Sequence, residues 1–206
     1  MTTPINWFKD FSFLDARAIK KIEILPSLYK NWNSQINVIS RRDENQIWEH
    51  HIIHSLILGL VIPHRSEMRV LDIGTGGGFP GIPLAIAFPD MQFTLIDSIG
   101  KKIKVVNSIV HDLQLKNINA IHGRAENVLG EYDIAVTRAV APLTKLISWM
   151  NGSWSKKGDN ALYALKGGDL TAEIKGLKAE LYPLKKWLNH PHYDSKYVVR
   201  VKATIK

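Results

Sequence analysis

A glycine-rich stretch directly after a short apolar run is the feature that most restricts how this chain can fold. Residues 70–85 read VLDIGTGGGFPGIPLA, in which five glycines follow the first apolar run and a second apolar run begins at Ile82. Glycine allows tight turns and lets a ligand approach the backbone where side chains would clash. The order of strand, glycine loop and helix therefore predicts an α/β fold with a nucleotide-like ligand at the loop.

The chain after Met68 alternates between short apolar runs that predict strands and longer amphipathic runs that predict helices. The predicted strands span residues 69–73, 92–97, 118–123, 132–139 and 161–167, and the predicted helices between them span 82–88, 101–115 and 141–150. This order predicts a doubly wound, mostly parallel sheet. Residues 171–184 have helical periodicity, and residues 197–205 alternate as a closing edge strand does.

The region before Met68 has helical character. Apolar residues recur at helical spacing between residues 16 and 36, where Pro26 predicts a division into two short helices. A further helix is predicted within residues 37–60, with a cap near Asp43 or Asn45. We therefore expect an N-terminal helical segment at residues 1–66 packed on a domain at residues 67–206, within one structural unit overall.

Composition narrows the class of protein. The 206 residues carry a formal net charge of +8 and no cysteine, and the isoelectric point is near 9.6. The charge favours a polyanionic partner such as nucleic acid, and the lack of cysteine excludes disulfides and thiolate metal sites. No apolar run approaches the roughly 20 residues of a membrane span, and the N-terminus lacks a signal-peptide pattern. We expect a cytoplasmic protein with no membrane contact.

Two aspartates indicate which nucleotide the glycine loop receives. Asp97 ends the second predicted strand, where a carboxylate can accept hydrogen bonds from both ribose hydroxyls. S-adenosylmethionine and a nicotinamide dinucleotide both carry that ribose. Asp72 precedes the loop and can orient it or reach an ammonium group through water, whereas a pyrophosphate disfavours a nearby negative charge. The two aspartates together favour the methyl donor.

Other nucleotide and metal chemistries fit less well. No Gly-Lys-Ser or Gly-Lys-Thr follows the glycines, which excludes a Walker phosphate loop. His50 and His54 could share one helical face as zinc ligands, but no third ligand or HExxH arrangement accompanies them, so we expect no metal site. A nicotinamide-dependent reductase is an alternative, although Tyr163 and Lys166 lack the usual four-residue register.

Several longer motifs resemble one family. DIGTGGGFPGIPLA, LIDSIGKKIKVV, HGRAE, TRAVAPL and YALKGG occur in this order, with NVISRRD and HHIIHS upstream. These motifs cover about residues 32–169 and are similar to those of the bacterial 16S ribosomal RNA guanine-N(7) methyltransferases of the glucose-inhibited division protein B family. The resemblance implies a class I S-adenosylmethionine-dependent methyltransferase with a Rossmann-like sheet. Gly77 and Phe79 depart from the family pattern, in which proline and leucine are frequent at these positions.

The resemblance also implies which residues bind the donor. By position these are Gly74, Gly76, Gly78, Phe79, Ala125, Glu126 and Arg138. Gly76 and Gly78 are expected to leave the donor room, while Ala125 and Glu126 match the adenine side. Arg138 matches the residue that closes the pocket near the methyl group. We add Asp97 as the ribose partner from its placement, and His51, His54 and Ser55 match a segment beside the site with no assigned chemical step.

The implied reaction needs no general base. Guanine N7 has an unprotonated lone pair at neutral pH, so positioning of the two reactants is the expected mechanism. Methyl transfer leaves a cationic ring, which an arginine lying on that ring would oppose. Arg138 is therefore expected to bind the donor carboxylate or an RNA phosphate. No catalytic residue is assigned, and Arg138 and Lys166 are the candidates.

The resemblance implies that the partner is 16S rRNA near the decoding centre, in the small ribosomal subunit or an assembly intermediate, and we expect the protein to bind it as a monomer. Candidate RNA-binding residues are Arg41, Arg42, His51, His54, Lys101, Lys102, Arg124 and Lys166. Lys166 is favoured because it follows a strand at the end where open sheets bind ligands. No tryptophan is nominated, since tryptophans at helical spacing belong mostly to cores. Methylation of another acceptor and a non-catalytic, ribosome-associated binding role are the alternatives.

Overall fold

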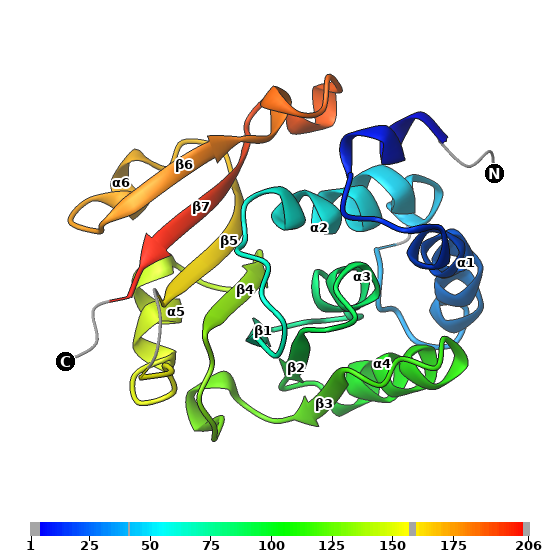
Figure 1. Ribbon diagram of the computed structural model, residues 1–206, viewed down its shortest axis with the longest axis horizontal. Helices are drawn as coiled ribbons and strands as arrows, with labels where there is room; N and C mark the ends of the chain where they lie inside the picture. The colour runs from blue at the N-terminus through cyan, green and yellow to red at the C-terminus, as the bar shows by residue number, and fades with distance from the viewer. Residues whose placement is uncertain (1–4, 41, 157–159, 204–206) are drawn as a thin grey trace.

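The computed structural model describes residues 5–40, 42–156 and 160–203, and these contain one seven-stranded sheet in the order β3-β2-β1-β4-β5-β7-β6 (Figure 1). The strands are β1 (Arg69–Ile73), β2 (Gln92–Asp97), β3 (Ile118–His122), β4 (Ile134–Arg138), β5 (Ala161–Gly167), β6 (Ala179–Pro183) and β7 (Lys196–Lys202). The first five strands pair in parallel, as the sequence predicts. Their carboxyl ends therefore lie along one edge of the sheet.

Helices and helical turns connect and cover the strands. The longer ones are α1 (Ala16–Asn33), α3 (Gly81–Ala87), α4 (Gly100–Asp112) and α5 (Leu143–Trp149). The shorter ones are η1 (Ile5–Asp10), η2 (Glu44–Gln46), η3 (Trp48–Ile53), α2 (His54–Leu56), η4 (Ile57–Leu60), η5 (Ala125–Asn127), α6 (Thr171–Ile174), η6 (Leu184–Lys186) and η7 (Pro191–Tyr193). Among the described residues, no helix is long and apolar enough to cross a membrane.

The C-terminal part of the sheet differs from the sequence prediction. β7 pairs antiparallel with both β5 and β6, so it lies inside the sheet and β6 forms the edge. The helix predicted at residues 171–184 is wrong beyond its first turn, because only α6 is helical and β6 follows. The apolar residues do have helical spacing, but Gly176 adopts a φ of 80° and turns the chain back toward β7.

The N-terminal helix is continuous, which corrects the expected division at Pro26. Pro26 removes one backbone donor, but the neighbouring Leu25 and Tyr29 are fully buried and hold the helix against the core. Asp15 begins the helix, because its Oδ1 accepts a hydrogen bond of 2.7 Å from the Ala18 amide.

Residues 44–60 are helical, as predicted, but they form four successive short turns, η2, η3, α2 and η4. The second of these is a π-helical turn, a form often found at functional sites. Asp43 does not cap the first turn with its side chain, which corrects that prediction. Its carboxylate instead accepts a hydrogen bond of 2.8 Å from Ser40 Oγ and lies 2.7 Å from His50 Nδ1.

Alternate residues of β1 point to opposite faces of the sheet and enter two separate buried clusters. Val70 belongs to the cluster that contains Ile22 of α1 and Ile82 of α3, together with side chains of α4 and of residues 47–58. Leu71 belongs to the cluster that contains Leu146 of α5. The N-terminal helices therefore cover the same face as α3 and α4, where they lie close to the glycine loop.

Candidate functional site

A cavity of about 410 Å³ lies at the carboxyl ends of the parallel strands. Its walls come from the glycine loop after β1, the end of β2 at Asp97, residues 123–126 after β3 and residues 138–140 after β4. This is the edge at which open α/β sheets bind ligands, and the volume lies in the range of small-molecule sites. The predicted donor-binding residues meet here, with the exception of Gly78.

Two glycines of the loop serve different purposes. Gly76 has a φ of 60°, and a Cβ built on it would meet no atom within 4 Å, so its face opens into free space at the cavity. Gly78 has a φ of 103°, and its Cβ would lie 2.4 Å from Ile82 Cδ1. Gly78 therefore allows the loop to pack on α3 and does not line the cavity, which corrects its expected role of leaving the donor room.

Asp97 closes the loop from the neighbouring strand. Its Oδ2 accepts a hydrogen bond of 2.8 Å from the Gly76 amide, and its Oδ1 accepts one of 2.9 Å from the Ile99 amide. Each carboxylate oxygen can accept a second hydrogen bond. Asp97 thus holds the loop and borders the cavity at the same time, which fits the predicted ribose partner.

Asp72 holds the same loop from the protein interior. Its side chain is fully buried, and Oδ2 accepts hydrogen bonds of 2.6 Å from Thr75 Oγ1 and 2.9 Å from the Gly81 amide. Oδ1 is buried with no hydrogen-bond partner. Burial raises the pKa of Asp72 to about 7. Of the two roles that the sequence leaves open, these contacts favour orientation of the loop.

Tyr29 supports the loop from α1, and the sequence offered no sign of this role. Its hydroxyl donates a hydrogen bond of 2.7 Å to the Gly77 carbonyl, and its ring stacks on Phe79 at 4.6 Å between centroids. Burial raises the pKa of Tyr29 well above its usual value, so the phenol stays neutral. Tyr29 and Gly77 are 48 residues apart, a separation across which periodicity carries no information.

Arg138 lies at the cavity end of β4. Its Nη1 donates a hydrogen bond of 2.9 Å to the His50 carbonyl, Nη2 lies 2.9 Å from His51 Nδ1, and the guanidinium is 5.2 Å from the centre of the Phe79 ring. Burial lowers the pKa of Arg138 to about 10, which leaves it charged at neutral pH. Among the described residues, no carboxylate forms an ion pair with Arg138 within 4 Å, so its charge is available to an anionic ligand.

His51 and His54 are buried, with 8% and 7% of their surfaces exposed, which argues against the predicted RNA contacts. Arginine can only donate, so His51 Nδ1 accepts from Arg138 and the neutral ring carries its proton on Nε2. That Nε2 is buried without a hydrogen bond, and Asp43 Oδ2 lies 3.7 Å away. Burial and the nearby Arg138 lower the pKa of His51 to about 3, and burial lowers that of His54 well below its usual value.

Side chains of η5 and α5 also line the cavity. Ala125 and Glu126, which the resemblance assigns to the adenine side, are among them. Trp149 of α5 also lines the cavity, with Lys145 Nζ 5.4 Å from the centre of its ring. Sequence reasoning missed Trp149, because a tryptophan at helical spacing looks the same whether its helix lines a core or a site.

The predicted basic contacts separate into groups. Lys102 and Arg124 line the cavity, whereas Arg42 and Lys101 are exposed outside its lining. Arg41 lies outside the described residues. The basic side chains at the cavity rim are therefore fewer than the sequence suggests.

Lys166 lies near the carboxyl end of β5, where it makes internal contacts and does not line the cavity. Its Nζ donates to the Ala141 carbonyl at 2.7 Å and pairs with Glu173 Oε1 at 2.7 Å. The same Glu173 oxygen accepts a hydrogen bond of 2.9 Å from the Leu143 amide at the start of α5. This placement argues against Lys166 as a catalytic candidate or an RNA contact. Its contacts instead connect β5 with α6 and with the start of α5.

The described residues contain no group of three or more histidine, cysteine, aspartate or glutamate side chains arranged to hold a metal ion. His50 instead pairs with Asp43 and stacks on His192, with 3.8 Å between the ring centroids. The HHIIH motif is thus used in packing and polar contacts.

Comparison with known proteins gives consistent results. The model of the GidB family, described as rRNA small subunit methyltransferase G, matches residues 18–194. Proteins called ribosomal RNA small subunit methyltransferase G from Cytophaga hutchinsonii and Flavobacterium psychrophilum are 44% and 42% identical to this chain. The alignments cover 95% and 96% of this chain and 97% of each relative.

Solved structures with low sequence identity share the fold. Precorrin-6y C5,15-methyltransferase from Geobacter metallireducens has a TM-score of 0.56 at 11% identity, over 82% of this chain and 92% of that chain. An S-adenosylmethionine-dependent methyltransferase from Aquifex aeolicus has a TM-score of 0.56 at 14% identity, over 73% and 89%. These likenesses confirm the predicted class I, Rossmann-like fold and carry no information on the acceptor.

Proposed function

Because the chain belongs to the GidB family of rRNA small subunit methyltransferases, we propose that it transfers a methyl group from S-adenosylmethionine to N7 of a guanine in 16S rRNA. One observation carries this proposal. The family match spans the cavity at the carboxyl edge of the sheet, where the glycine loop, Asp97 and Arg138 converge. The net charge of +8 supports a polyanionic acceptor.

The cavity residues fit the donor chemically. Asp97 keeps accepting capacity for ribose hydroxyls, and the open face of Gly76 leaves room beside it. Arg138 offers a cation without a carboxylate partner, which suits the carboxylate of the donor's methionine part. Ala125 and Glu126 border the end proposed for adenine.

When bound, S-adenosylmethionine supplies an electrophilic methyl group, and guanine N7 can accept it without first losing a proton. The chain therefore contributes positioning, which is worth up to roughly 7–11 kcal/mol in well-oriented reactions. Asp72 and Tyr29 hold the glycine loop rigid from behind, and Arg138 is held by His50 and His51. In this mechanism no side chain has to act as a general base.

We further propose that the acceptor is the 16S rRNA of a small ribosomal subunit or of an assembly intermediate, near the decoding centre. The protein would act there as a monomer in the cytoplasm. The names of the relatives support ribosomal RNA as the class of acceptor, and the net positive charge of the chain supports contact with a ribonucleoprotein particle.

The test uses small subunits from a strain that lacks this enzyme and S-adenosylmethionine labelled in its methyl group. The expected product is labelled 7-methylguanosine in 16S rRNA, identified by nucleoside mass spectrometry. Asp97→Asn is expected to raise the donor Kd by about ten-fold or more, because a charge-assisted hydrogen bond is lost. Asp90→Asn is the matched control, since Asp90 is exposed and outside the cavity lining.

Two results would contradict the proposal. Donor binding without label in subunits, assembly intermediates or free rRNA would overturn guanine methylation. An equal effect of the Asp97 and Asp90 substitutions would show that Asp97 does not serve the donor.

A further inference from the structure

In the part of the chain that the structure describes, two half-buried or buried cations, Arg138 and Lys196, have no carboxylate partner within 4 Å. Among the described residues, the hydrogen-bond partners of Arg138 are the His50 carbonyl and His51, and those of Lys196 Nζ are the two ring nitrogens of His192. No carboxylate in the described part of the chain lies within 4 Å of Lys196 Nζ. A desolvated cation is costly unless an anion or hydrogen-bond acceptors compensate it.

Lys196 is part of a compact group of polar side chains. His192 stacks on His50 with the two rings 14° from parallel, and Lys196 lies against the edge of His192. All three side chains are partly exposed. Burial and the neighbouring Lys196 lower the pKa of His192 to about 4, and burial and Arg138 lower the pKa of Lys196. His192 is therefore neutral near pH 7, and its ring can accept a hydrogen bond from Lys196.

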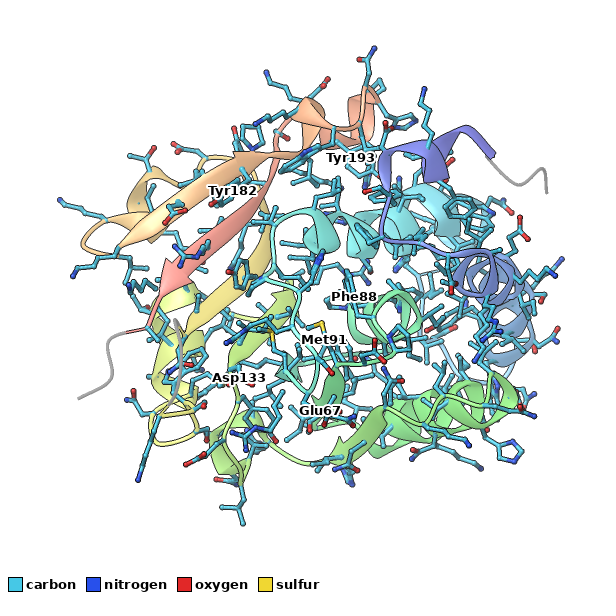
Figure 2. The ribbon with its side chains drawn as sticks, viewed as in Figure 1. Glu67, Phe88, Met91, Asp133, Tyr182 and Tyr193 are labelled. Carbon is cyan, nitrogen blue, oxygen red and sulfur yellow. The ribbon has the colours of Figure 1, made fainter. Side chains whose placement is uncertain are left out.

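The group lies next to the cavity through a chain of direct contacts. Arg138 lines the cavity and donates to the His50 carbonyl, and the His50 ring stacks on His192. The segment that carries His192 is fastened to the N-terminal helices, because Tyr193 Oη donates a hydrogen bond of 2.5 Å to the Glu49 carbonyl. Figure 1 shows this orange segment beside α2 and η1, and Figure 2 shows Tyr193 at their junction.

We propose that Lys196, His192 and His50 form a binding site for one backbone phosphate of the acceptor RNA, at the rim of the cavity. This inference rests on the function proposed above. A base that enters a cavity from an RNA strand brings its flanking phosphates to the rim, where they position the nucleotide without reading its sequence. Lys196 can turn from the His192 ring to the phosphate, and the imidazoles can donate from the nitrogen that carries the proton.

One carboxylate, that of Asp43, lies beside this group. The charge of Asp43 acts on both His192 and Lys196, but its carboxylate is already engaged by Ser40 and His50. Arg138 remains for the donor carboxylate. The site thus offers two separate cations for two separate anions, one on the donor and one on the acceptor.

The test measures binding of the full-length protein to small subunits that lack the methyl group, at several salt concentrations. Lys196→Gln is expected to weaken this binding by about ten-fold. It is also expected to reduce the slope of log K against log salt by about 0.7–0.9, the contribution of one phosphate contact. Lys196→Arg, which keeps the cation, is expected to restore most of the affinity.

Lys202→Gln is the matched control. Lys202 is exposed at the other end of the same strand, about 20 Å away at the rise of a β-strand, and its replacement changes the net charge equally. The Kd for S-adenosylmethionine is measured for every variant and is expected to be unchanged. Equal unfolding midpoints show that the variants are folded.

The outcomes separate this site from the proposed function. If wild-type protein forms 7-methylguanosine while the Lys196 and Lys202 variants bind subunits alike with the same salt slope, the phosphate site is overturned and the function stands. The site is also overturned if Lys196→Gln weakens donor binding as much as subunit binding. If wild-type protein forms no 7-methylguanosine but Lys196→Gln alone loses affinity and slope, the phosphate site is supported and the guanine acceptor is not.

Discussion

Asp72→Asn is expected to stabilise the protein at neutral and alkaline pH, although it replaces the carboxylate that holds the glycine loop. Oδ2 of Asp72 accepts both hydrogen bonds that hold the loop, from Thr75 Oγ1 and the Gly81 amide. The amide oxygen of asparagine can accept the same two bonds. The amide nitrogen then replaces Oδ1, which is buried and has no partner.

The magnitude follows from the pKa of the buried carboxyl group. Burial raises the pKa of Asp72 from 3.8 to about 7, a difference of about three units. Between these values the unfolded chain releases the proton and the folded chain retains it, so the wild-type free energy of unfolding falls as pH rises from about 4 to 7. At 1.36 kcal/mol per unit the total loss is up to about 4 kcal/mol. Asparagine cannot ionise and lacks this loss.

Urea unfolding of both proteins at pH 5, 6, 7 and 8 measures the effect. The variant is expected to gain stability relative to wild type as pH rises to 7, with a constant difference above that. Asp90→Asn, which removes an exposed carboxylate, controls for the change in net charge. A variant less stable than wild type at pH 8, or a difference independent of pH, would refute the reasoning and show that the loop requires an ionised Asp72.

Tyr29→Phe removes the hydroxyl that donates a hydrogen bond to the Gly77 carbonyl, and it is expected to cost about 0.5–1.5 kcal/mol of stability. It is also expected to raise the Kd for S-adenosylmethionine, measured by calorimetry. An unchanged Kd would show that α1 does not support the site. Gly74→Ala is expected to destabilise by about 1–3 kcal/mol, since φ is 66° and the new Cβ would lie 2.6 Å from Val140; urea unfolding measures it, and equal stability would contradict it. Lys166→Gln is expected to lower the melting temperature but leave RNA affinity unchanged; a selective loss of affinity would reinstate Lys166 as an RNA contact.

The sequence predicts the part of the fold that local pattern determines. Five parallel strands and the helices between them follow from alternation along the chain, and the order of strand, glycine loop and helix locates the cavity. The errors lie where local pattern and tertiary context disagree. Pro26 does not break α1, because buried neighbours on both sides hold the helix. Residues 171–184 have helical spacing, yet β7 offers an edge with which β6 pairs.

Site residues show the same division. Gly74, Gly76 and Asp97 border the cavity because their positions relative to the strands already determine their location. Gly78 and Lys166 occupy equally suggestive positions, but their contacts are internal, with Ile82 and with Glu173. A sequence shows that a residue lies near the carboxyl end of a strand, and it does not show which way the side chain turns.

The N-terminal helices explain why the site cannot be derived from the Rossmann-like part alone. Tyr29 of α1 supports the glycine loop, while His50 and His51 hold Arg138 at the cavity wall beside it. The same helical turns receive the C-terminal segment through the Glu49 carbonyl. The donor cavity and its rim are therefore built from both ends of the chain around the sheet. A change in the N-terminal packing should consequently alter donor affinity and RNA affinity together, whereas a change at the rim should alter RNA affinity alone.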